Sequence, residues 1–150
     1  MSDERERTER QLAELLQELR VALPGVQILF AFLLTVPFAQ GFEDVTSFQK
    51  NLFFATLLFT AISTACLIAP TATHRLRFHK RDRNYVVEVA HRLTIAGLAF
   101  LALAIVCAVA LITDLLFDGA ARWLWPAIVA LVIAVLWFIR PSLRNESSGP

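Results

Sequence analysis

The chain has 150 residues and a formal net charge of +1, with 57% hydrophobic and only 18% charged residues. The hydrophobic share exceeds the roughly 45–50% that is usual for soluble domains, and the length suits one domain. A net charge near zero gives no reason to expect a nucleic-acid partner. Two cysteines, Cys66 and Cys107, are too few for a disulfide framework or a four-ligand metal site.

The first segment, residues 1–22, is charged and contains a stripe of leucines. Leu12, Leu15, Leu16 and Leu19 recur at three- and four-residue steps, which is typical of an amphipathic helix. Such a helix is expected to lie on the inner leaflet of a membrane or to pack on the helix bundle. A partner-binding or self-association helix is the alternative. We expect the chain to turn at Pro24-Gly25 into the first membrane span, which Pro37 kinks near its outer end.

Four apolar segments follow, at residues 23–42, 52–69, 93–116 and 124–139. A membrane span needs about 17–25 mostly apolar residues, and the backbone inside hydrocarbon must satisfy its own hydrogen bonds as a helix. The predicted fold is all-α: a four-helix transmembrane bundle over residues 23–140 with an N-terminal amphipathic helix. The third helix is expected to begin near Asp82 and to extend into the cytoplasm. Residues 141–150 form a cytoplasmic tail.

The orientation follows from the 14 Lys and Arg residues. Twelve of them flank the spans in the N-terminal segment, the central loop and the tail, and only Lys50 and Arg122 lie in the other two loops. Because positive residues stay in the cytoplasm, both termini are predicted to be cytoplasmic in a multi-pass membrane protein. Trp123 and Trp125 are then expected at the outer face, where amphipathic rings favour the headgroup level.

The central loop, residues 71–92, is the most basic part of the chain. Lys and Arg clustered beside a membrane attract anionic lipid headgroups. Alternatively, this positive charge only sets the orientation of the spans in the membrane. The candidate lipid contacts are Arg75, Arg77, Lys80, Arg81 and Arg83.

A polar stripe runs along the second span. Its hydroxyls suit packing and hydrogen bonding between membrane helices, and lining of a polar pathway is the alternative. In that alternative Asp114 stands at the outer mouth, although a solvated residue at a helix end is the simpler interpretation of this carboxylate. The candidate pathway residues are Gln27, Thr56, Thr60, Ser63, Thr64 and Asp114.

No set of residues indicates chemistry. His74, His79 and His91 are the only histidines, and no carboxylate or thiol stands at a ligand-like offset from them. No nucleophile, base and acid converge at one depth, and no span has an ionisable residue near its middle, as proton-coupled transport usually requires. The sequence therefore predicts no catalytic residue, no metal site, no cofactor and no enzymatic activity.

The runs ELLQELRVALPGVQ at residues 14–27 and LFAFLLTVPF at residues 29–38 resemble a bacterial family of small four-span membrane proteins. The similarity continues through residues 68–70, His74-Arg75 and residues 111–114, and it departs at His91, where the family pattern has Asn. The resemblance implies a multi-pass protein of a bacterial cell membrane without an established function. Some members carry an automatic sodium:proton antiporter label.

Taken together, the residues favour a non-enzymatic membrane protein with a structural or regulatory role at the cytoplasmic membrane surface. Phe-rich faces and small-residue patches favour a homo-oligomer or a membrane-protein partner, besides the membrane lipids themselves. The alternative is an ion transporter or channel subunit, similar to a cation:proton antiporter, whose pathway forms between protomers.

Overall fold

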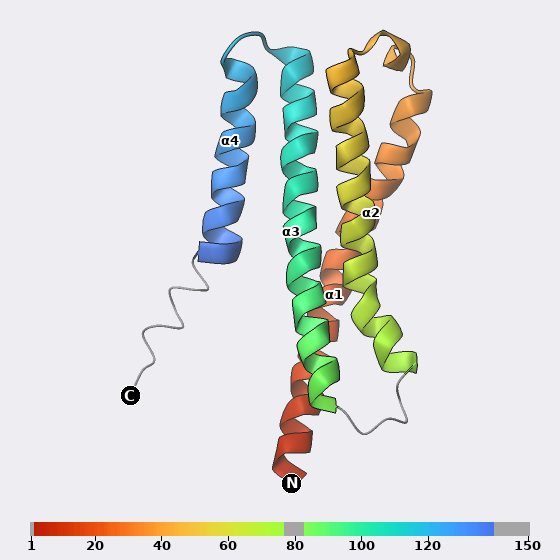
Figure 1. Ribbon diagram of the computed structural model, residues 1–150, viewed down its shortest axis with the longest axis vertical. Helices are drawn as coiled ribbons and strands as arrows, with labels where there is room; N and C mark the ends of the chain where they lie inside the picture. Colours follow the sequence, from red (N-terminus) through yellow and green to blue (C-terminus); the bar gives the residue numbers. More distant parts are fainter. Residues whose placement is uncertain (1, 77–82, 140–150) are drawn as a thin grey trace. The chain divides into compact units, whose positions relative to one another are not determined.

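A computed structural model of the chain describes residues 2–76 and 83–139. Within these ranges it contains four α-helices and no strand (Figure 1), which confirms the predicted all-α class. The helices are α1 (Ser2–Thr35), α2 (Ser47–Leu76), α3 (Arg83–Leu116) and α4 (Ala121–Ile133). Two short 3₁₀-helices, Val36–Phe38 and Phe42–Asp44, join α1 to α2, and a π-helix, Ala134–Ile139, continues α4.

The predicted turn at Pro24-Gly25 is wrong, because α1 runs through Pro24 as one helix of 34 residues. Pro24 removes one backbone hydrogen bond, to the carbonyl of Arg20. The good helix formers Leu, Glu, Gln and Ala on both sides keep the helix intact. The amphipathic segment is therefore the first part of a helix about 50 Å long, with no loop between it and the apolar segment.

The predicted kink at Pro37 is instead the end of α1. The helix stops at Thr35, and Pro37 lies inside the 3₁₀-helix Val36–Phe38. A proline disfavours helical geometry at the residue before it. The backbone N–H of Ala39 then closes the turn onto the carbonyl of Val36 at 3.0 Å.

The two central helices are longer than the apolar segments that predicted them. Helix α2 extends on both sides of residues 52–69 and passes through Pro70, and α3 begins at Arg83, one residue after the predicted start. By length and composition alone, Ser47–Pro70 and Glu88–Leu116 could each cross a membrane. The apolar segments of the first and last helices, Leu23–Phe38 and Ala121–Trp137, are shorter.

The chain divides into two compact units. The first unit comprises Met1–Phe42 and Leu57–Leu101. Its core joins three helices, since Val26 of α1 and Leu67 of α2 are buried together, with Leu23 and Leu101 packed against them.

Helices α2 and α3 approach closely inside the first unit. The hydroxyl of Ser63 donates a hydrogen bond of 2.8 Å to the carbonyl oxygen of Gly97. A Cβ atom added at Gly97 would lie 2.8 Å from Cγ and Cδ2 of Leu67 and 3.2 Å from Cβ of Cys66. The missing side chain therefore permits both the helix contact and the buried hydrogen bond.

The second unit comprises Glu43–Thr56 and Ala102–Pro150. It contains the first turns of α2, the second half of α3, and α4. Buried positions in this unit include Phe53, Ala104, Ala110 and Pro126, together with the polar residues Gln49 and Thr113. The second unit thus also contains polar side chains that are buried among apolar helices.

Candidate functional site

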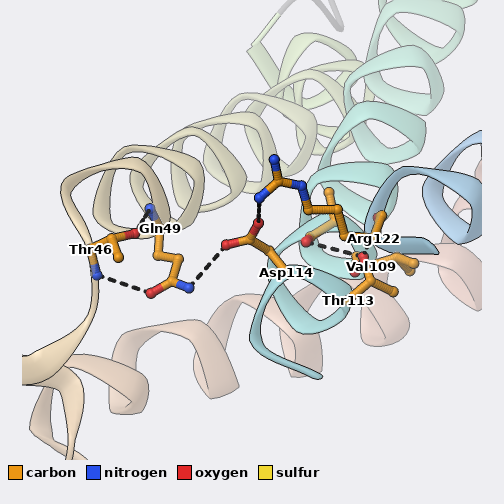
Figure 2. A network of polar contacts seen from close by, with 7 residues as sticks. Thr46, Gln49, Val109, Thr113, Asp114 and Arg122 are labelled. Carbon is orange, nitrogen blue, oxygen red and sulfur yellow. Dashed lines mark hydrogen bonds and ion pairs between the residues drawn. The ribbon is translucent and has the colours of Figure 1, made fainter. Parts of the chain in front are cut away.

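Four polar residues of the second unit form a connected cluster, which we call the Asp114 network (Figure 2). Its members are Thr46 and Gln49 at the start of α2, Asp114 near the end of α3, and Arg122 in the first turn of α4. The network therefore joins the start of α2 to the end of α3 and the start of α4, which follow at least 65 residues later.

The start of α2 explains how Gln49 is held. The backbone N–H of Thr46 donates to Oε1 of Gln49 at 3.0 Å, and the backbone N–H of Gln49 donates to Oγ1 of Thr46 at 3.3 Å. This reciprocal pair is a capping box, in which two otherwise unpaired backbone donors of a helix start are satisfied. Because its oxygen is used by the cap, the amide nitrogen of Gln49 is directed away from the cap.

That nitrogen reaches Asp114. Nε2 of Gln49 donates to Oδ2 of Asp114 at 3.0 Å, while Nη1 of Arg122 lies 3.4 Å from Oδ1. The Asp114 side chain is only 11% exposed and Gln49 is buried. A carboxylate removed from water needs partners for both oxygens, and the network supplies one donor to each.

A second contact ties α3 to α4 beside the network. The hydroxyl of Thr113 lies 2.8 Å from the carbonyl oxygen of Arg122, and also within reach of the carbonyls of Val109 and Ala110 in its own helix. In α4 the carbonyl of Arg122 would normally accept from the N–H four residues later. That residue is Pro126, which has no N–H, so the hydroxyl of Thr113 replaces the missing donor.

An aromatic cluster adjoins the network at the same helix ends. The guanidinium carbon of Arg122 lies 5.6 Å from the ring centroid of Trp123, within the range of a cation–π contact. Phe48 meets Trp123 edge to face, with the ring centroids 6.0 Å apart. Arg122 therefore has one side toward Asp114 and another over an indole ring.

Most of the predicted polar stripe of α2 is buried, and the hydroxyls of Thr56, Ser63 and Thr64 donate to backbone carbonyls. Thr56, Thr60 and Ser63 have no exposed surface. Thr56 donates to the carbonyl of Leu52 and the partly buried Thr64 to that of Thr60, both at 2.8 Å. Both bonds lie within α2 itself, where a Ser or Thr hydroxyl commonly bonds to the carbonyl four residues earlier, and the pathway interpretation stays a prediction.

The structure groups the remaining candidates differently from the sequence. Gln27 is exposed on α1 in the first unit, whereas Asp114 belongs to the second unit. Asp114 has two partners, Gln49 and Arg122, and neither was recognised in the sequence as a functional residue. Thr46 and Gln49 carried a usable signal, because Thr-x-x-Gln before an apolar run is the pattern of a capping box.

The predicted lipid contacts of the central loop are not described by the structure. Arg77, Lys80 and Arg81 lie in the gap between residues 76 and 83, and the side chains of Arg75 and Arg83 lie outside the described residues. In the part of the chain that is described, no three His, Cys, Asp or Glu side chains are grouped as metal ligands would be. The anionic-lipid contacts stay predictions.

The fold and the network define an all-α protein in which two helices are long and apolar enough to cross a membrane. The chain belongs to a family of unknown function, DUF6328, whose model matches residues 2–141. No curated protein and no solved structure matches it. The predicted membership of a family without an established function is thereby confirmed, while a bacterial origin and the antiporter label stay predictions.

Proposed function

We propose that the protein is a non-enzymatic, polytopic membrane protein whose four apolar helices cross a bacterial cell membrane. Its role is structural or regulatory at the cytoplasmic surface, in association with lipids and with a second copy or another membrane protein. One observation supports the proposal. In the described part of the chain, several polar side chains are buried, whereas many large apolar side chains are exposed.

The buried polar residues lie on α2 and α3. They are Gln49, Thr56, Thr60, Ser63 and Thr113. Large apolar side chains, by contrast, are exposed on all four helices, for example Ile28 at 71%, Phe54 at 62%, Leu116 at 69% and Leu131 at 64%. Water would oppose this arrangement, because each large apolar side chain left exposed forfeits about 1.5–3 kcal/mol. Hydrocarbon would favour it.

The shorter apolar helices fit the proposal when their flanking structure is included. The π-helix Ala134–Ile139 adds six residues to the 13 of α4, which brings its helical length into the range of about 17–25 residues for a span. The 3₁₀-helix Val36–Phe38 extends the apolar end of α1 in the same way. Trp123 and Phe38, which are exposed, suit positions at the membrane interface.

Labelling of single cysteines in intact cells tests the four crossings. In a background with Cys66→Ala and Cys107→Ala, a reporter cysteine replaces Glu14, Asp44 or Asp118, all of which are exposed. A membrane-impermeant maleimide should label positions 44 and 118 from outside, and position 14 only after permeabilisation.

The three reporters also distinguish the alternatives. If only α2 and α3 crossed the membrane, positions 14 and 44 would lie on the same side and label together. If every position labelled in a fraction released by carbonate washing, the protein would be peripheral. Either result would overturn the four-span proposal, whereas labelling of position 14 alone from outside would overturn only the orientation.

A further inference from the structure

Arg122, Trp123 and Phe48 form a surface at one end of the second unit, which we call the Arg122 surface. Arg122 and Trp123 belong to the first turn of α4, and Phe48 to the first turn of α2. All three side chains are exposed, at 45%, 51% and 46%. A cation and two aromatic rings therefore lie together where two apolar helices begin.

The guanidinium of Arg122 keeps donors available on this surface. It carries five N–H groups in a planar fork. Among the described residues, only Nη1 has a hydrogen-bond partner, which is Asp114 at 3.4 Å. The Trp123 ring, 5.6 Å away, covers one face of the group without using its donors. The remaining N–H groups suit a planar or tetrahedral oxyanion, for which arginine is the preferred partner.

The charges of the other exposed side chains in the second unit indicate which kind of ligand carries the oxyanion. Its described loop and helix ends carry exposed carboxylates at Glu43, Asp44 and Asp118, against the cations Lys50 and Arg122. Lys50 is held toward the backbone, since its ammonium donates to the carbonyl of Glu43 at 3.5 Å. A purely anionic ligand would meet this excess of negative charge, whereas a ligand with one phosphate and one ammonium group would find partners for both.

We propose that the Arg122 surface binds the headgroup of a zwitterionic phospholipid that carries a phosphodiester and a primary ammonium, as phosphatidylethanolamine does. The phosphate accepts hydrogen bonds from Arg122, and the upper acyl chain lies against Trp123 and Phe48. The exposed carboxylates of the same unit attract the ammonium. This inference rests on the proposed function, because a lipid reaches the surface only if these helix ends lie at the membrane interface.

Native mass spectrometry of the full chain, purified in mild detergent, tests the proposal. Phosphatidylethanolamine or phosphatidylglycerol is added at equal concentration, and the fraction of protein that retains lipid is measured. Wild type is compared with Arg122→Gln and Arg122→Lys. Arg92→Gln is the matched control, because Arg92 is also exposed and ion-paired, to Glu88 at 2.8 Å, but it has no aromatic contact among the described residues.

We expect wild type to retain phosphatidylethanolamine in preference to phosphatidylglycerol. Arg122→Gln should lower this retention roughly three- to tenfold, the range for one charge-assisted contact at a partly exposed site. Arg122→Lys should lower it less, because a point charge still attracts the phosphate. Arg92→Gln should leave it unchanged. Arg122→Lys can still form an ion pair with Asp114. Its comparison with wild type therefore tests the role of the guanidinium even if Arg122→Gln fails to fold.

Equal retention by wild type, Arg122→Gln and Arg92→Gln would overturn the proposal, as would stronger retention of phosphatidylglycerol by wild type. The failure of the membrane proposal itself looks different. In that case the reporter cysteines at positions 14, 44 and 118 would label in a fraction released by carbonate washing, whatever the lipid measurement shows. If the three reporter proteins stayed in the membrane after carbonate washing and lipid retention did not depend on Arg122, this inference alone would be overturned.

Discussion

The side-chain amide of Gln49 bridges the start of α2 and the end of α3, since it accepts from the backbone of Thr46 and donates to Asp114 at 3.0 Å across 65 residues. The oxygen and the nitrogen of the amide therefore have different roles. The oxygen caps a helix and the nitrogen pairs a shielded carboxylate. A glutamate side chain at this position could still cap the helix, but it would present a second carboxylate to Asp114.

Gln49→Glu is therefore expected to destabilise the protein by about 1–3 kcal/mol, the range for a buried polar group that loses its partner. Adding Asp114→Asn should recover much of the loss, because the asparagine amide can donate to the carboxylate introduced on α2. Thermal unfolding of the four proteins in detergent measures this double-mutant cycle. Simple additivity of the two single substitutions would show that Gln49 and Asp114 are not coupled.

Thr113→Val is expected to destabilise the protein by about 1 kcal/mol, because it removes the donor to the carbonyl of Arg122 while keeping the side-chain shape. The physical reason is the missing N–H of Pro126. In a Pro126→Ala background that N–H is restored, so the cost of Thr113→Val should shrink. Thr113→Ser keeps the hydroxyl and serves as the control. An equal cost of Thr113→Val in both backgrounds would contradict this account.

Gly97→Ala is expected to destabilise the protein by about 1–3 kcal/mol through overpacking, because the new methyl group would meet Leu67 at 2.8 Å. Gly25→Ala is the matched control in another helix. No atom lies within 4 Å of the Cβ it would add, so helix propensity should make it neutral or stabilising. Unfolding temperatures measure both changes, and Leu67→Ala should partly rescue Gly97→Ala. Equal effects of the two alanine substitutions would refute the close helix contact.

Ser63→Ala is expected to cost about 0.6 kcal/mol, the average for a hydrogen bond between membrane helices. It removes the donor from α2 to the carbonyl of Gly97 in α3. Thr64→Ala is the comparison, because the Thr64 hydroxyl bonds to the carbonyl of Thr60 in its own helix and should matter less to unfolding. A larger loss of stability in Thr64→Ala than in Ser63→Ala would show that the Ser63 hydroxyl does not stabilise the contact between α2 and α3.

Proteoliposomes that contain the protein are expected to show no cation flux driven by a pH gradient. The best-placed carboxylate of the described apolar helices, Asp114, has both oxygens engaged by Gln49 and Arg122, whereas a transport site must release its partners to bind an ion. A fluorescent pH indicator inside the vesicles measures exchange. Flux in wild type that disappears in Asp114→Asn would instead support the transporter alternative.

The sequence by itself determined the helical class and the positions of the helices. Residues 52–69 and 93–116 are mostly apolar, and a run of this kind predicts a buried or membrane helix regardless of its neighbours. The start of α3 was predicted within one residue because Tyr85, Val86, Val89 and Leu93 recur at helical spacing before the apolar run. Prolines were less informative: Pro24 and Pro70 lie inside helices, because the loss of one hydrogen bond does not outweigh the helix formers around it.

Only the tertiary structure decided which side chains contact one another. Asp114 looked like a solvated residue at a helix end, and nothing in the sequence relates it to Gln49, 65 positions away. Likewise, the role of Thr113 depends on a carbonyl that Pro126 leaves without its helical donor, and the role of Gly97 on the nearness of Leu67. Such contacts arise from how helices pack against one another, whereas local sequence governs only whether each helix forms.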